Sequence, residues 1–243
     1  VEANAGASAI AIAIVLGARK GWPRESMRPH SVPFVIIGAG ILWFGWFGFN
    51  AGSALAANET SAFAFVNTNI AGAAGLLGWM GWERYKNGHP TTLGAASGAI
   101  AGLVAITPSC GFISPMASAF VGVAAGIVCA SAITLKHRVK IDDSLDVFGV
   151  HLVAGVLGTI FIGFVSINSY NHSATKGLLT GGGAALLEHQ LIAVIAVIAY
   201  AFIATFLLAH LIKRTIGLRV TPDDESRGLD LSQHMETAYD MTT

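Results

Sequence analysis

The sequence predicts an all-α protein that crosses a membrane several times. Of its 243 residues, 53% are hydrophobic and only 12% are charged, and the mean hydropathy is +0.64. This composition is typical of a polytopic membrane protein rather than a soluble domain. Apolar windows of about 20 residues, the length that a transmembrane helix needs, recur along the chain, and basic residues fall between them in a regular pattern.

Seven apolar segments are candidate transmembrane helices. The first is apolar from Val1 and lacks the features of a signal peptide, so we expect the remainder of a helix whose start is missing. The fourth is short, and Pro108 and Gly111 after it predict a helix end and a bend at membrane depth, where only protein or water can satisfy the backbone. The expected spans are residues 1–17, 31–54, 61–82, 93–107, 115–135, 144–168 and 187–212.

Basic residues predict which loops face the cytoplasm. Thirteen of the fourteen Lys and Arg residues lie in alternate loops and after the last span, and only Lys176 lies on the other face. The positive-inside rule makes the alternate loops cytoplasmic, so the chain after Ile212 is expected in the cytoplasm. The thirteen are Arg19, Lys20, Arg24, Arg28, Arg84, Lys86, Lys136, Arg138, Lys140, Lys213, Arg214, Arg219 and Arg227.

Several classes of function are not indicated. The net charge is zero and no basic run is long, so neither a nucleic-acid partner nor a polybasic membrane anchor is expected. Cys110 and Cys129 show no metal-ligand or redox spacing, so no metal or cofactor is predicted. No hydrolase, kinase or nucleotide motif occurs, and we expect no enzyme.

Small residues predict close packing of the helices. Gly98-x-x-x-Gly102, Gly122-x-x-x-Gly126 and the run from Ala71 to Gly75 allow helix backbones to approach closely in lipid. The few large or polar residues are then left to line any path through the bundle.

His151 is the strongest candidate for a functional residue. It lies inside an apolar span, where ionisable side chains are rare and usually face a protein interior or a water-filled path, and imidazole changes charge near physiological pH. The alternative is a core histidine that a neighbouring helix satisfies.

A second candidate site lies on the span 31–54. Trp46, Phe49 and Ser53 share one helix face, where aromatic rings and a hydroxyl could hold a small cation. The alternative is an aromatic belt at the membrane interface.

Four runs resemble the ammonium transporter family, the Amt/Mep/Rh group, and its bacterial Amt branch closely. They are Gly45-Trp46-Phe47-Gly48-Phe49-Asn50-Ala51-Gly52-Ser53, Gly98 to Val104 with Thr107-Pro108, Asp146-Val147-Phe148-Gly149-Val150-His151, and Gly217-Leu218-Arg219-Val220. The resemblance implies a trimer whose subunits have eleven spans, with two five-helix halves of inverted topology. The seven spans here match the fifth to the eleventh, that is, the second half plus the last helix.

The resemblance implies site residues. In the family two pore histidines face each other; His151 matches the second, and Glu2 occupies the place of the first. A carboxylate also occurs there in some fungal members, and the alternative is a solvated charge beside the chain end. Ser53 matches the serine that recruits ammonium, and Phe49 matches one of two gating phenylalanines. Trp46 and Thr107 would line the pore wall.

The implied mechanism is transport of ammonium as ammonia through a hydrophobic pore, because burying an isolated ammonium ion is costly. The proton is lost at the outer gate and carried separately, and Glu2 and His151 are the polar residues of the pore.

The expected organisation is a transmembrane domain, 1–214, and a cytoplasmic regulatory tail, 215–243. In the family this tail couples the three pores and supports recognition by the PII signal protein; the alternative is a disordered acidic end. Two other functions stay open: an ammonium sensor that signals through a cytoplasmic partner, and a channel for another small solute, although the paired Asn-Pro-Ala loops of aquaporins are absent.

Overall fold

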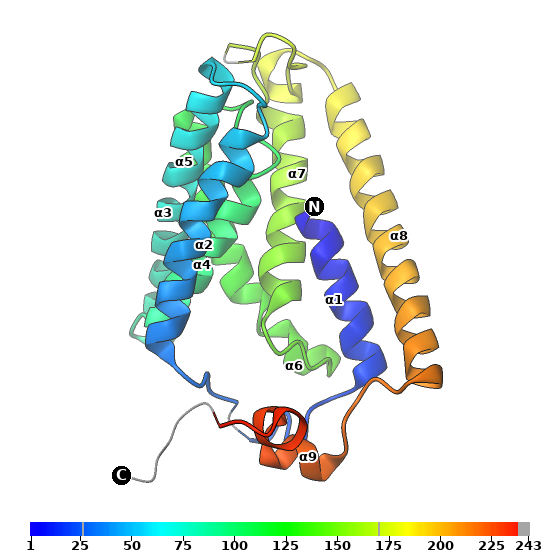
Figure 1. Ribbon diagram of the computed structural model, residues 1–243. Coiled ribbons are helices and arrows are strands. Elements are labelled where there is room, and N and C mark those ends of the chain that lie inside the picture. Colours follow the sequence, from blue (N-terminus) through cyan, green and yellow to red (C-terminus); the bar gives the residue numbers. More distant parts are fainter. Residues whose placement is uncertain (26, 170, 238–243) are drawn as a thin grey trace.

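The computed structural model describes residues 1–25, 27–169 and 171–237 as a bundle of long helices (Figure 1), and contains no strand in these residues. Each of the seven segments expected to span a membrane contains a helix, which confirms the all-α class. They are α1 (Glu2–Leu16), α2 (Val32–Gly52), α3 (Glu59–Asn87), α4 (Thr92–Ile106), α5 (Pro115–Ala132), α7 (Val153–Val165) and α8 (Ala185–Thr215).

Shorter helical turns complete the described chain. A π-helical turn, η1 (Phe148–Leu152), leads directly into α7, and α6 (Leu135–Val139) follows α5. The tail folds into α9 (Pro222–Arg227) and η3 (Asp230–His234), which lie below the bundle (Figure 1), and η2 (Leu178–Thr180) lies at the opposite end.

Among the described residues, four helical segments are long and apolar enough to cross a membrane by length and composition: Val32–Gly52, Pro115–Val139, Phe148–Val165 and Ala185–Thr215. The helices α1 and α4 are apolar but shorter than 18 residues. The 29 residues of α3 provide the length, but their composition is more polar. A crossing by each of these three helices stays a prediction.

Local sequence determines where most helices begin. Ser31, Thr91 and Ser114 accept hydrogen bonds from backbone amides of the first turns of α2, α4 and α5, and Asn58 and Ser61 form a capping box at the start of α3. These caps satisfy amides that have no partner within the helix, so each of these helices begins at a defined residue.

The centre of the bundle is formed by α3, α4 and α5, as the small residues predicted. A side-chain carbon at Gly102 would collide with the backbone of Ala71, and one at Gly126 would collide with the backbone of Gly75. Leu103, in the last turn of α4, is completely buried. Packing of small residues therefore holds these three helices at backbone contact.

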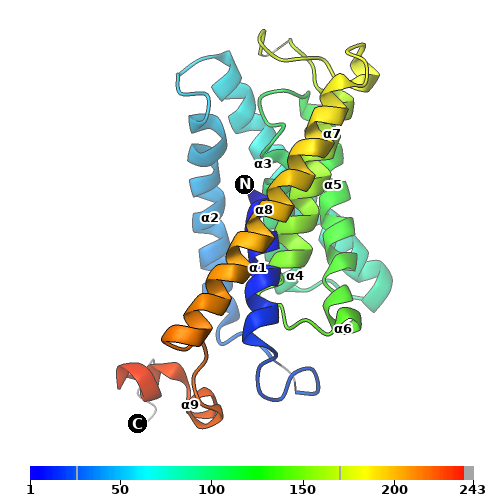
Figure 2. The same ribbon diagram turned by 90° about the vertical axis from the view of Figure 1, so that its right-hand side faces the viewer.

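The helix α1 lies between α7 and α8 (Figures 1 and 2). Its last carbonyls have no partner inside the helix. The ammonium group of Lys213 donates to the carbonyl of Val15 at 2.9 Å, and the guanidinium of Arg219 donates to that of Leu16 at 3.1 Å. The end of α1 is thus held by the end of α8 and the start of the tail.

An ion pair anchors the loop after α1. The guanidinium of Arg19 donates to both carboxylate oxygens of Asp142 at 2.7 and 2.8 Å, and the Arg19 amide adds a third bond of 2.8 Å. Burial by itself raises the pKa of the Asp142 carboxyl, but the hydrogen bonds from Arg19 outweigh it and hold this pKa below its usual value. The pair ties α1 to the segment that leads into η1.

We expect Arg19→Gln to destabilise the protein more than Asp142→Asn does. Arg19→Gln leaves a carboxylate whose side chain is 1% exposed without its charged partner, whereas Asp142→Asn leaves a guanidinium that is 38% exposed. The expected loss for Arg19→Gln is roughly 1 to 2 kcal/mol, since the partly exposed guanidinium is screened by solvent. Thermal unfolding, followed by tryptophan fluorescence, measures which of the two variants is less stable.

The pair also predicts a dependence on pH. Because folding lowers the pKa of Asp142, the stabilisation is fully present above the ordinary aspartate pKa of about 3.9 and is lost as pH falls through the lower folded value. The stability difference between wild type and Arg19→Gln should therefore be constant from pH 7 to about 5 and shrink below about 4. A difference that shrinks already between pH 7 and 6 would contradict this assignment.

Candidate functional site

Glu2 and His151 meet inside the bundle although they lie 149 positions apart in the sequence. Oε2 of Glu2 lies 2.6 Å from Nδ1 of His151, and the two side chains are 11% and 26% exposed. A nitrogen and an oxygen come this close only when a hydrogen atom lies between them. The structure therefore places a hydrogen-bonded pair of ionisable groups, which shares at least one proton, among apolar helices.

Two glycines bring Glu2 within reach of His151. A side-chain carbon at Gly6 would collide with Leu152, and one at Gly155 would collide with the backbone of Ala3 and touch the Glu2 side chain. The backbones of α1 and of the η1–α7 segment are therefore in direct contact, as small residues permit in membrane helices. Without this approach the carboxylate could not reach the imidazole.

His151 itself lies in the π-helical turn η1, which the sequence did not predict. π-helical turns are rare and often occur at functional sites. The carboxylate of Asp143 accepts hydrogen bonds from the amides of Val147 at 3.0 Å and Phe148 at 2.7 Å. This buried carboxylate holds the start of the turn in which His151 lies.

Trp46 and Thr107 connect α2 to the end of α4. The indole Nε1 of Trp46 donates to Oγ1 of Thr107 at 2.8 Å, and the Thr107 hydroxyl donates to the carbonyl of Leu103 at 2.8 Å. Trp46 is buried, and the ring of Phe49 meets it edge-on with centroids 5.7 Å apart. The two residues expected to line a pore wall are thus hydrogen-bonded to each other.

A cavity of about 260 Å³, which we call the mouth cavity, collects the residues expected at a gate. Phe49, Ser53 and Thr107 line it together with Val1. The Ser53 hydroxyl donates to the carbonyl of Phe49 at 2.6 Å. The Ser53 hydroxyl therefore uses its only proton in this bond, and its oxygen can still accept a hydrogen bond from a ligand.

A second cavity of about 260 Å³, the inner cavity, adjoins Glu2. It lies between α1, α4, α7 and α8, and Thr107 and Val1 line it as well as the mouth cavity. Trp46 does not line either one. Thr107 therefore contacts both the mouth cavity and the cavity beside Glu2.

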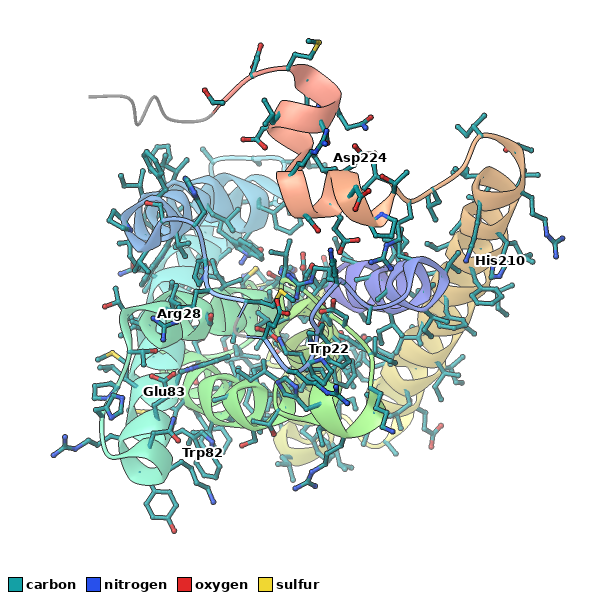
Figure 3. The ribbon with its side chains drawn as sticks, turned by 90° about the horizontal axis from the view of Figure 1, so that it is seen from below. Trp22, Arg28, Trp82, Glu83, His210 and Asp224 are labelled. Carbon is teal, nitrogen blue, oxygen red and sulfur yellow. The ribbon has the colours of Figure 1, made fainter. Side chains whose placement is uncertain are left out.

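The opposite, basic end of the bundle has a larger opening of about 740 Å³. Trp22 stacks on the ring of His137 at 5.8 Å there, and Trp22 and Arg28 both come from the loop between α1 and α2 (Figure 3). All thirteen basic residues named above belong to loops or helix ends on this side (Figure 1). These basic residues thus distinguish this end of the bundle from the opposite end.

Three polar residues of the core were not singled out from the sequence. Asn50 donates to Thr68 at 3.0 Å, and Asn67 donates to the carbonyls of Cys110 at 2.8 Å and Ile113 at 2.9 Å. Asparagine inside an apolar helix is itself a signal, because buried amides need partners. Which partners they have depends on tertiary contacts.

This arrangement defines a class: a helical membrane protein in which a carboxylate and an imidazole meet inside an apolar bundle below an aromatic and hydroxyl-lined mouth. The sequence profile of the Ammonium Transporter Family matches residues 1–239. The chain therefore belongs to the ammonium transporter family and is part of a multi-pass membrane protein.

Relatives and solved structures agree with this assignment. The chain is 50% identical to an ammonium transporter of Mycobacterium bovis over 99% of its length and 51% of that protein, and 46% identical to ammonium transporter Amt1 of Archaeoglobus fulgidus over 98% and 60%. It superposes on Candida albicans Mep2 with a TM-score of 0.84 at 34% identity, which covers 91% of this chain and 51% of that one. The chain spans about half the length of these relatives.

We expect Gly155→Ala to separate Glu2 from His151, because the added carbon requires α1 to move away from α7. Gly38→Ala is the matched control, since nothing lies within 4 Å of a carbon built there. The measurement is a double-mutant cycle of thermal stability with Glu2→Gln. Glu2→Gln should cost less in the Gly155→Ala background than in the Gly38→Ala background. Equal costs in both would show that Gly155 does not position the pair.

Proposed function

We propose that the complete protein transports ammonium across the cell membrane as ammonia. The observation that carries the proposal is the Glu2–His151 pair, 2.6 Å apart among apolar helices of this family's fold. Ionisable groups inside a membrane protein usually mark a path for substrate or protons. Relatives over almost the whole chain are named ammonium transporters, which supports the same substrate and no enzymatic role.

Recruitment is assigned to the mouth cavity. The face of the Phe49 ring can attract a cation, and Ser53 can accept one hydrogen bond from it. Passage further in as a bare ammonium ion would leave a charge in apolar surroundings. Loss of one proton at the gate removes that cost, and ammonia then passes Thr107 into the inner cavity.

We assign the transfer of the proton that ammonium loses at the gate to the Glu2–His151 pair. When the pair is neutral overall, it offers an acceptor at Oε1 of Glu2 on one side and a donor at Nε2 of His151 on the other, on whichever atom the shared hydrogen lies. The pair can therefore take up a proton from the gate side and release it toward the basic end while ammonia moves through the apolar path.

The basic end is assigned to the cytoplasm by the positive-inside rule, so the mouth cavity faces outward and the tail inward. The contacts of α9 support an ordered, regulatory tail over the described residues 215–237; residues 238–243 lie outside them. Lys20 donates from its amide to Glu225 at 2.8 Å and from its side chain to Ser226 at 2.7 Å. A homotrimer and a cytoplasmic partner such as the PII signal protein belong to the same proposal.

A second candidate function is ammonium sensing through a cytoplasmic partner. It is supported by a solved structure titled Sensor Amt Protein, which matches 96% of this chain with a TM-score of 0.85 at 31% identity. The two functions make different demands on the pore. A sensor keeps its function when flux through the Glu2–His151 pair is blocked, whereas a transporter does not.

Substitutions at Glu2 test the proposed function. In protein expressed from its complete gene, Glu2→His should keep transport active and move its pH dependence, because a second imidazole replaces the carboxylate in the proton-sharing pair. Glu2→Leu should reduce charge movement more than ammonia passage, because the proton loses its acceptor. Solid-supported-membrane currents measured against pH, together with ammonia uptake, separate the two effects.

The control is Glu188→Leu, which removes an exposed carboxylate at the start of α8 and should leave the current profile unchanged. If wild type, Glu2→His and Glu2→Leu give coinciding profiles, Glu2 has no part in the pore and is a solvated charge.

A further inference from the structure

Asn50 has an acceptor atom without a partner. The residue is 3% exposed and is, with Trp46, one of the two buried residues in the described helix α2. Its Nδ2 donates to Oγ1 of Thr68 at 3.0 Å, but its Oδ1 is buried and has no hydrogen-bond partner among the described residues. A buried carbonyl oxygen that gives up its water without gaining another donor costs free energy.

The orientation of the Asn50 amide is set by Thr68. The Thr68 hydroxyl donates its single proton to the carbonyl of Ala64 at 2.6 Å, so toward Asn50 it can only accept. The amide nitrogen must therefore face Thr68, and the oxygen must face away from it. The free acceptor is thus a consequence of the hydrogen-bond network and not of an arbitrary choice between nitrogen and oxygen.

Asn50 also lines the mouth cavity, beside Phe49 and Ser53. Positions 46, 49, 50 and 53 follow helical spacing and share one face of α2. On the described part of α2, a ring, a hydroxyl and an amide oxygen suited to hold a small N–H donor therefore belong to residues that line one cavity. A second buried amide, Asn67, also has a free Oδ1, but it does not line this cavity.

We propose that Asn50 is a substrate-binding residue of the gate: its Oδ1 accepts a hydrogen bond from the substrate nitrogen in the mouth cavity. The proposal rests on the function proposed above and adds a residue to it. Ammonium has four N–H donors and no acceptor, so each acceptor in the cavity replaces one lost hydrogen bond to water. Ser53 supplies one such acceptor, Phe49 supplies a ring face, and Asn50 supplies the second oxygen.

Two substitutions separate binding from structure, because both remove the neutral amide that donates to Thr68. Asn50→Leu also removes the free acceptor, whereas Asn50→Asp keeps an oxygen in that place. In proteoliposomes that contain protein expressed from its complete gene, Asn50→Leu should raise the ammonium concentration for half-maximal current about tenfold, the effect of one hydrogen bond to a charged group. Asn50→Asp should leave this concentration unchanged or lower it.

Asn67→Leu is the matched control. It removes a buried amide with two hydrogen bonds and the same kind of free oxygen, so it should lower thermal stability without changing the half-maximal concentration. Size-exclusion chromatography and thermal unfolding establish that each variant is folded. If Asn50→Leu does not fold, Asn50→Asp alone decides, and a tenfold rise in its half-maximal concentration overturns the proposal.

The proposal is also overturned if Asn50→Leu and Asn50→Asp weaken binding equally, since the contact with Thr68 is then the whole role of Asn50. Failure of the proposed function gives a different result. In that case the wild-type protein itself shows no saturable ammonium current, and both proposals fail together.

Discussion

The contact between α1 and the η1–α7 segment is the interaction on which the site depends. It joins residues that lie almost 150 positions apart, and it requires two glycines, Gly6 and Gly155, because any side chain at either would push the helices apart. The same helix is held at its other end by Lys213, and the loop after it by Asp142. With both ends fixed, the carboxylate of Glu2 meets His151 at hydrogen-bond distance.

Placing polar groups inside an apolar bundle imposes a second constraint, because each needs a partner within the protein. Most have one: Trp46 donates to Thr107, Thr107 donates to Leu103, and Asp143 accepts from the first amides of η1. Three buried side-chain atoms of the described residues have no partner: Nε1 of Trp43, Oδ1 of Asn67 and Oδ1 of Asn50. Of these three residues, only Asn50 lines the mouth cavity.

Much of the fold was predictable because apolar length and the placement of charge are properties of the chain itself. The helix in each expected segment and the close packing around Ala71 and Gly102 follow from residue type. The extension of α3 to Asn87 and the end of α5 at Ala132 depend on capping and on loop contacts. The π-helical turn around His151 has no local signature. The pairing of Glu2 with His151 came from family resemblance alone, since no spacing rule connects residues so far apart.

The central claim is that Glu2 and His151 form one proton-sharing pair inside the membrane. Infrared spectroscopy at one fixed pH tests it most directly: the complete protein is labelled with ¹³C at the glutamate side-chain carboxyls, and the Glu2 band is identified by its loss in Glu2→Gln. The account predicts that His151→Leu shifts the frequency of the Glu2 band, because the carboxyl group loses its hydrogen-bond partner. A Glu2 band with the same frequency in both proteins would contradict it.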